Sequence, residues 1–181
     1  MNLASLRPAA YLVFLLGLCP MLVCQAAPTR NDLRQFLTAD GKLRSSLVLR
    51  EAQQGFAGVS GEVWTIEPDG RFSIARFLNE KVDAPYWTRK LSAAACKGLA
   101  RVLAARRFFE LPDSLGSAAV VNPQLLTLTF GKKQSTLALV AGEEVTRETA
   151  PPPSDPQVRE WRSFITIVLA MHDLAQNRPG T

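Results

Sequence analysis

The chain has few of the residues on which most metal sites depend. Its 181 residues include one histidine, His172, and three cysteines. Cys19 and Cys24 lie near the N-terminus, so Cys96 stands alone in the rest of the chain, which excludes an internal disulfide there. No His-x-x-x-His or Cys-x-x-Cys spacing occurs, and a zinc ion would need carboxylates for most of its ligands. We therefore predict no metal and no other cofactor.

The usual signals of nucleophilic catalysis are also missing. There is no Gly-x-Ser-x-Gly elbow, and His172 is the one histidine that a serine nucleophile could use as a base. His172 follows Val168 by four residues on the apolar edge of a predicted helix, which is typical of a packed or rim histidine. Cys96 has core spacing to Leu99 and Leu103, so we expect a buried structural thiol. The sequence predicts a non-catalytic protein, with a dispersed carboxylate site as the enzymatic alternative.

A strong charge of one sign is missing as well. The formal net charge is +5, and it falls to about +4 if the N-terminal segment with Arg7 is removed. The basic residues are scattered along the chain. We therefore predict that nucleic acid is not a partner.

The N-terminus lacks an apolar run long enough for a confident membrane span, which needs about twenty residues. Arg7 precedes a shorter apolar run that is interrupted by Pro20 and followed by small residues, as in a secretory signal. We predict a signal peptide at residues 1–26, with cleavage after Ala26 or, as the alternative, after Ala27. The mature protein is then secreted or periplasmic and has no membrane span. Two alternatives are lipid attachment at Cys24, which Val23 disfavours, and an uncleaved anchor.

Alternating apolar residues predict strands from residue 45 onward. A first strand is expected at residues 47–49 and a hairpin at residues 61–67 and 71–78, where Pro68, Asp69 and Gly70 form the turn. A second hairpin is expected around residues 126–130 and 136–139, with its turn at Gly131. Residues 79–90 are expected to be an irregular connection and residues 113–122 a loop.

Two helices complete the predicted fold. The first begins at a Ser92 N-cap and ends at the Phe108-Phe109-Glu110-Leu111-Pro112 segment; the second follows a capping box of Ser154 and Gln157. We predict one α+β domain at residues 45–176, with a mostly antiparallel sheet of about five strands and two helices packed on one face. A flexible leader is expected at residues 27–44, a proline-rich connector at 142–153 and a frayed tail at 177–181.

The segment Gly55-Phe56-Ala57-Gly58 is the candidate binding site. Glycines allow the backbone to turn freely, whereas a phenylalanine between them is too large and apolar to be left in water without a reason. Two interpretations follow. Phe56 either folds back to cover the end of the sheet, or it is presented as an aromatic anchor that enters a pocket of a partner protein.

Gly55-Phe56-Ala57-Gly58 before a tryptophan-bearing strand, and a helix that closes on Phe108-Phe109-Glu110-Leu111-Pro112, resemble the emfourin-type protein inhibitors of protealysin, a thermolysin-like metalloprotease. The resemblance covers these two short motifs. It implies a small α+β domain and a protease as the protein partner. It leaves the contact surface open, and our own hypothesis places Phe56 of the 55–58 segment in the cleft of the protease.

Two functions are therefore expected, both of them non-catalytic. The first is an exported binding protein, in its most concrete form a protease inhibitor, that uses the segment Gly55, Phe56, Ala57 and Gly58. The alternative is a structural or assembly factor of the cell envelope that binds a protein partner through an edge of its sheet.

Overall fold

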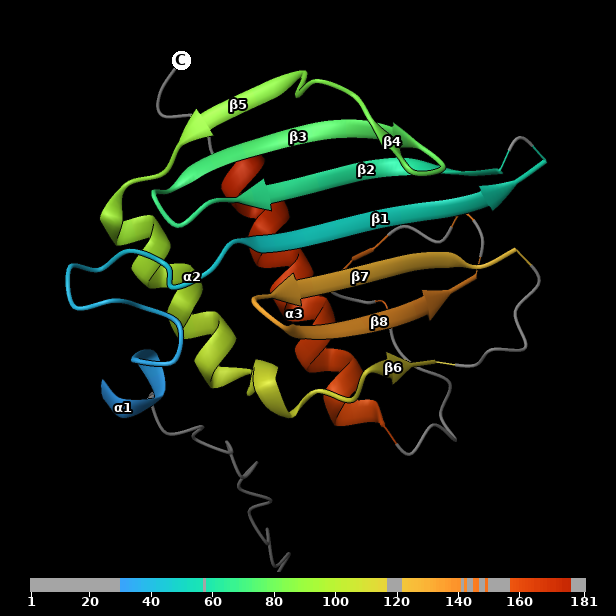
Figure 1. The fold of residues 1–181 in the computed structure, drawn as a ribbon. Helices are drawn as coiled ribbons and strands as arrows, with labels where there is room; N and C mark the ends of the chain where they lie inside the picture. Colours follow the sequence, from blue (N-terminus) through green and yellow to red (C-terminus); the bar gives the residue numbers. More distant parts are fainter. Residues whose placement is uncertain are drawn as a thin grey trace, which may run out of the picture.

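A computed structural model describes residues 30–56, 58–116, 122–140, 142, 145, 146, 149 and 157–176. The α+β class is confirmed (Figure 1). In chain order the elements are α1 Arg30–Leu33, β1 Leu47–Gly55, β2 Gly58–Ile66, β3 Arg71–Leu78, β4 Lys81–Val82, β5 Trp87–Lys90, α2 Ala93–Ala105, a 3-10 turn Phe108–Glu110, β6 Ser114–Leu115, β7 Gln124–Phe130, β8 Lys133–Leu139 and α3 Val158–Gln176.

One sheet contains all of these strands. Its order is β4-β3-β2-β1-β7-β8-β6, and β5 also pairs with β3. All neighbours are antiparallel except β6 and β8, which are parallel. The sheet has eight strands, so the expected number of about five was too low. β4, β5 and β6 account for the difference, because each is only two to four residues long and lies where a connection or a loop was expected.

The turn between β2 and β3 forms as its sequence predicts. Arg71 donates its backbone N–H to the Asp69 carboxylate at 2.9 Å, and Gly70 has a φ of 87°, which suits glycine. These contacts fix the register of β3, which places Phe72 and Ile74 opposite Ile66 and Trp64.

Both long helices lie on the same side of the sheet (Figure 1). The predicted Ser92 cap is confirmed, because its side chain accepts the backbone N–H of Ala95 at 3.2 Å. α2 then ends at Ala105, and Arg107 takes the left-handed conformation with a φ of 53°, so the Phe108 segment forms a separate 3-10 turn. The core lies between sheet and helices and includes Leu47, Leu49, Ile66, Leu128, Phe164 and Val168.

The segment expected to be a flexible leader contributes to this core. Phe36, Leu37 and Leu43 are buried, and a backbone bridge joins Leu37 to Leu43. The packed domain therefore begins before residue 45, which corrects the predicted boundary. The predicted signal at 1–26, Ser154 of the capping box, most of the connector at 142–153 and the tail at 177–181 lie outside the described residues.

The other face of the sheet carries small and β-branched residues, among them Val48, Val63, Thr65 and Thr127. None of the helices in the described part of the chain covers it (Figure 1). Nor does any described helix combine the length and apolar character that crossing a membrane would require.

Candidate functional site

The predicted binding segment is the turn of the β1–β2 hairpin. Gly55 pairs directly with Gly58, so the loop between the two strands consists of Phe56 and Ala57. Phe56 is fully exposed, with a relative accessible area of 116%, and Ala57 lies outside the described residues. The interpretation that Phe56 folds back over the sheet is therefore wrong. We call residues 55–58 the tip; it extends past the neighbouring strands at one end of the sheet (Figure 1).

Asn79 holds the base of the tip in place. The side-chain oxygen of Asn79 accepts the backbone N–H of Val59 at 3.0 Å, and the backbone N–H of Asn79 donates to the carbonyl of Val59. Gly58 has a φ of 108°, and a Cβ atom at this position would collide with the Asn79 side chain. Glycine is therefore required at residue 58 on both conformational and steric grounds.

On the face of the sheet that points away from the helices, Phe77 and Arg50 support the same hairpin. Phe77 lies opposite Gly61, where a Cβ atom would collide with the Glu51 carbonyl. The guanidinium carbon of Arg50 lies 3.7 Å from the centroid of the Phe77 ring, and Arg50 donates to the Asn79 carbonyl at 2.8 Å. Phe77 is thereby buried on a face that no described helix covers, and β1, β2 and β3 are joined close to the tip.

On the helix side, His172 of α3 contacts the same hairpin. Its Nε2 lies 2.7 Å from a carboxylate oxygen of Glu51, and its ring lies 4.7 Å from the Trp64 ring, centroid to centroid. Sequence analysis placed His172 correctly at a packed position but missed Glu51. A signal was present, because Glu51 continues the alternation of the buried Leu47 and Leu49 and so faces the helices.

A second carboxylate lies directly across from Glu51. Glu62 pairs with Glu51 in the register of β1 and β2, and it accepts the hydroxyl of Tyr86 at 2.7 Å. Partial burial, together with this hydrogen bond, raises the pKa of Tyr86 to about 12. Each carboxylate of this pair therefore has its own partner, which offsets the repulsion expected between two like charges on adjacent strands.

The hairpin residues nearest to Phe56 are uncharged. No charged residue occurs in the sequence between Glu51 and Glu62. The neighbouring positions carry amides and a hydroxyl, namely Gln53, Gln54, Ser60, Asn79, Asn122 and Gln124. Leu78, opposite Ser60 on β3, adds a second exposed apolar side chain, of which 52% is accessible. The tip thus has the character of an interface anchor: an aromatic side chain with a neutral polar rim.

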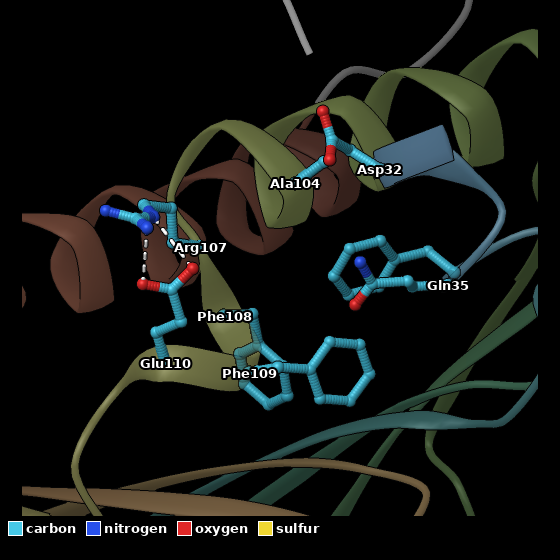
Figure 2. Close-up of a pocket in the computed structure, with 8 residues that line it drawn as sticks. Asp32, Gln35, Ala104, Arg107, Phe108, Phe109 and Glu110 are labelled. Atoms are coloured by element: carbon cyan, nitrogen blue, oxygen red, sulfur yellow. Dashed lines mark hydrogen bonds and ion pairs between the residues drawn. The ribbon is translucent and has the colours of Figure 1, made fainter. Parts of the chain in front are cut away.

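A pocket of about 220 Å³ lies at the opposite end of the molecule, between the α1 segment and the end of α2 (Figure 2). Phe36 and Phe109 stack there with ring centroids 5.0 Å apart. Arg107 and Glu110 form an ion pair at 2.8 Å on one wall, and Asp32 and Gln35 lie across from them (Figure 2). The charged side chain of Arg107 is thus neutralised within the pocket wall, and the pocket chiefly shows how this end of the core is closed.

Two observations concern the Cys96 thiol and the grouping of metal-binding side chains among the described residues. Burial raises the pKa of the Cys96 thiol, which disfavours the reactive thiolate. Within residues 30–56, 58–116, 122–140 and 157–176 and the four single described positions, no three or more His, Cys, Asp or Glu side chains are grouped to hold a metal ion.

The outermost strands of the sheet are short, as far as the described residues show. β4 and β5 both pair with β3, and between them Asp83 and Tyr86 donate their backbone N–H groups to the carbonyls of Arg76 and Ile74. The outermost strands β4, β5 and β6 have two, four and two residues. β4, β5 and β6 themselves offer few backbone groups to a partner strand, whereas on the outer side of the seven-residue β8 the described pairing with β6 covers only Thr136 and Leu137.

Neither the scan against protein-family models nor the search of curated proteins finds a match for this chain.

Proposed function

We propose that the chain is an exported, non-catalytic binding protein whose partner receives the side chain of Phe56. The observation that supports this proposal is the full exposure of Phe56 in the two-residue turn of a hairpin whose strands are each nine residues long. Large aromatic side chains are common anchors of protein interfaces, and they bind best when the surrounding backbone is already ordered.

Order at the tip comes from contacts on both sides of the hairpin. Asn79 and Arg50 join it to β3, and the Glu51–His172 pair joins it to α3. A partner would therefore spend little binding free energy on fixing the backbone around Phe56.

The specific form of the proposal is a protease inhibitor that occludes an active-site cleft. The resemblance of Gly55-Phe56-Ala57-Gly58 and of the Phe108-Phe109-Glu110-Leu111-Pro112 segment to emfourin-type inhibitors favours it, and so does the expected export signal. A protruding apolar side chain is a suitable shape for a concave cleft. The alternative is an assembly factor that binds through a sheet edge, for which the outer side of β8 is the candidate among the described strands.

The test is inhibition by the mature protein, residues 27–181. We would titrate it against thermolysin, a trypsin-like protease and a subtilisin-like protease, following hydrolysis of a peptide substrate. Saturable inhibition of at least one enzyme is expected. Phe56→Ala should weaken that inhibition by about 30-fold or more, which corresponds to about 2 kcal/mol of binding free energy.

A matched control is Lys132→Ala, because Lys132 has an exposed side chain in the two-residue turn of the β7–β8 hairpin. This variant should inhibit like the wild type. If no enzyme is inhibited, or if both variants inhibit equally well, the proposed function is wrong.

A further inference from the structure

The backbone beside Phe56 is paired across the hairpin, and the flanking strands end a few residues short of it. Within the hairpin, Gly55 pairs with Gly58, Gln54 with Val59 and Gln53 with Ser60. Outside it, β7 pairs with β1 as far as Gln53, and β3 pairs with β2 as far as Ser60. Asn79 then binds both the N–H and the carbonyl of Val59. Both strands of the hairpin are therefore flanked to within a few residues of Phe56.

This pairing decides how a protease could hold the tip. An extended peptide bound in a cleft gives its backbone N–H and C=O groups to the enzyme, much as an added strand gives them to a sheet. If the enzyme took up the backbone groups of Gly55, Gly58 or Val59, the Gly55–Gly58 pair or the contacts of Asn79 would have to break. Each of these hydrogen bonds would have to be replaced, whereas insertion of the Phe56 ring alone requires none of them to break.

We infer that Phe56 enters its partner as a side-chain plug while the hairpin stays closed. This inference rests on the proposed function. The partner then offers an apolar pocket wide enough for a phenyl ring, with a rim that carries hydrogen-bonding groups and little charge, to match the amides around the tip. A protease inhibited in this way does not cut the peptide bonds on either side of Phe56, because they never take an extended form in its active site.

A disulfide across the hairpin tests whether the strands must open. The backbone N–H and C=O of Val59 both bond to Asn79. Gln54 and Val59 therefore form a non-hydrogen-bonded pair of the antiparallel ladder. The Cα atoms of such a pair lie about 4.5 Å apart, which a disulfide can span. The double variant Gln54→Cys/Val59→Cys would be compared in its oxidised and reduced forms against the protease that the wild type inhibits.

The plug mode predicts equal inhibition by the two forms, within about twofold, because the oxidised hairpin is locked in the closed form seen here. It also predicts that the wild type keeps its intact mass after long incubation with the active protease. If the oxidised form inhibits at least about tenfold more weakly than the reduced form, or if the chain is cut next to Phe56 while it inhibits, the plug mode is wrong.

These outcomes differ from a failure of the proposed function. If Phe56→Ala weakens inhibition and the oxidised double-cysteine variant does not inhibit, then the partner binds Phe56 but the hairpin has to open for binding. If no protease is inhibited, or if Phe56→Ala has no effect, the proposed function falls and the plug mode falls with it.

The absence of charged residues between Glu51 and Glu62 suggests a second measurement. Raising the salt concentration from 50 to 500 mM should change the inhibition constant by less than about threefold, because screening acts on charged pairs. A decrease in affinity of about tenfold or more would show that charged groups dominate the contact and would overturn the neutral partner surface.

Discussion

Two hairpins of the sheet, β1–β2 and β7–β8, place an aromatic residue and a glycine in opposite orders around turns of the same length. In β1–β2 the paired residues that flank the turn are Gly55 and Gly58, and Phe56 lies within the turn. In β7–β8 the paired residues are Phe130 and Lys133, and Gly131 lies within the turn. The accessible fraction is 116% for Phe56 and 3% for Phe130. The exposed Phe56 is therefore the first residue inside its turn, whereas the buried Phe130 is the last paired residue before its turn.

The two ends of the sheet differ in the same way. Phe130 lies 5.5 Å from Phe36, 6.4 Å from Phe108 and 6.1 Å from Phe109, measured between ring centroids. At the end near the tip, the supporting contacts are hydrogen bonds of Asn79 and a cation–π contact of Arg50. The aromatic cluster stabilises the fold, whereas the polar contacts hold the hairpin in position and leave Phe56 free.

The largest expected effect is a stability difference between the two phenylalanines. Phe130→Ala should lower the free energy of unfolding by about 3–5 kcal/mol, because it leaves a cavity within the aromatic cluster. Phe56→Ala should change it by less than about 0.5 kcal/mol, as expected for an exposed side chain. Urea denaturation of both variants measures the difference, and equal losses would contradict the contrast between the hairpins.

The next effect concerns the glycines of the two turns. Gly58→Ala should cost about 2–3 kcal/mol, since it adds a clash with Asn79 to an unfavourable φ. Gly131→Ala is the matched control: its φ is 60°, the nearest atom to its new Cβ would be the Ser45 hydroxyl oxygen at 3.2 Å, and the expected cost is about 1 kcal/mol. A smaller loss for Gly58→Ala than for Gly131→Ala would argue against the Asn79 contact.

The smallest effect tests the polar bonding near the tip. Tyr86 is the one tyrosine of the predicted mature chain, so its absorbance can be followed alone, and its midpoint should lie near pH 12. The unfolded chain loses this proton near pH 10, so the associated stability is fully present below pH 10 and is lost as the pH rises to 12.

Glu62→Gln is the control for this titration. It removes the carboxylate that accepts the Tyr86 hydroxyl, so the midpoint should move toward 10. A wild-type midpoint already near 10 would contradict the Tyr86–Glu62 contact.

Strong local signals made much of the fold predictable. The alternation around Trp64 and Phe72, the Asp69-Gly70 turn and the Ser92 cap all act within a few residues of the chain, and each is present in the structure. β4 and β6 could not be predicted in this way, because two paired residues carry no period. Phe36, Leu37 and Leu43 were missed because they lie singly or in pairs among polar residues, and their burial depends on contacts with distant elements.

The candidate site was located from composition, but its geometry was not. The polar pair Gln53 and Gln54 suggested that the first strand had ended, whereas β1 continues to Gly55 and its register sets the two-residue turn. Exposure of Phe56 follows from that register. Glu51 and His172 are 121 residues apart in the sequence. The alternation of β1 predicts that Glu51 faces the helices, but it does not identify His172 as the partner.

The independence of Phe56 from the core has a consequence for how such a protein evolves. A single nucleotide change turns a phenylalanine codon into one for leucine, isoleucine, valine, tyrosine, serine or cysteine. At residue 56 each of these replacements would leave the buried residues, the β1–β2 register and the Asn79 contacts intact. Under the proposed function, substitutions at residue 56 alone can therefore change the range of partners without destabilising the fold. The same substitutions at Phe130 would be removed by selection for stability.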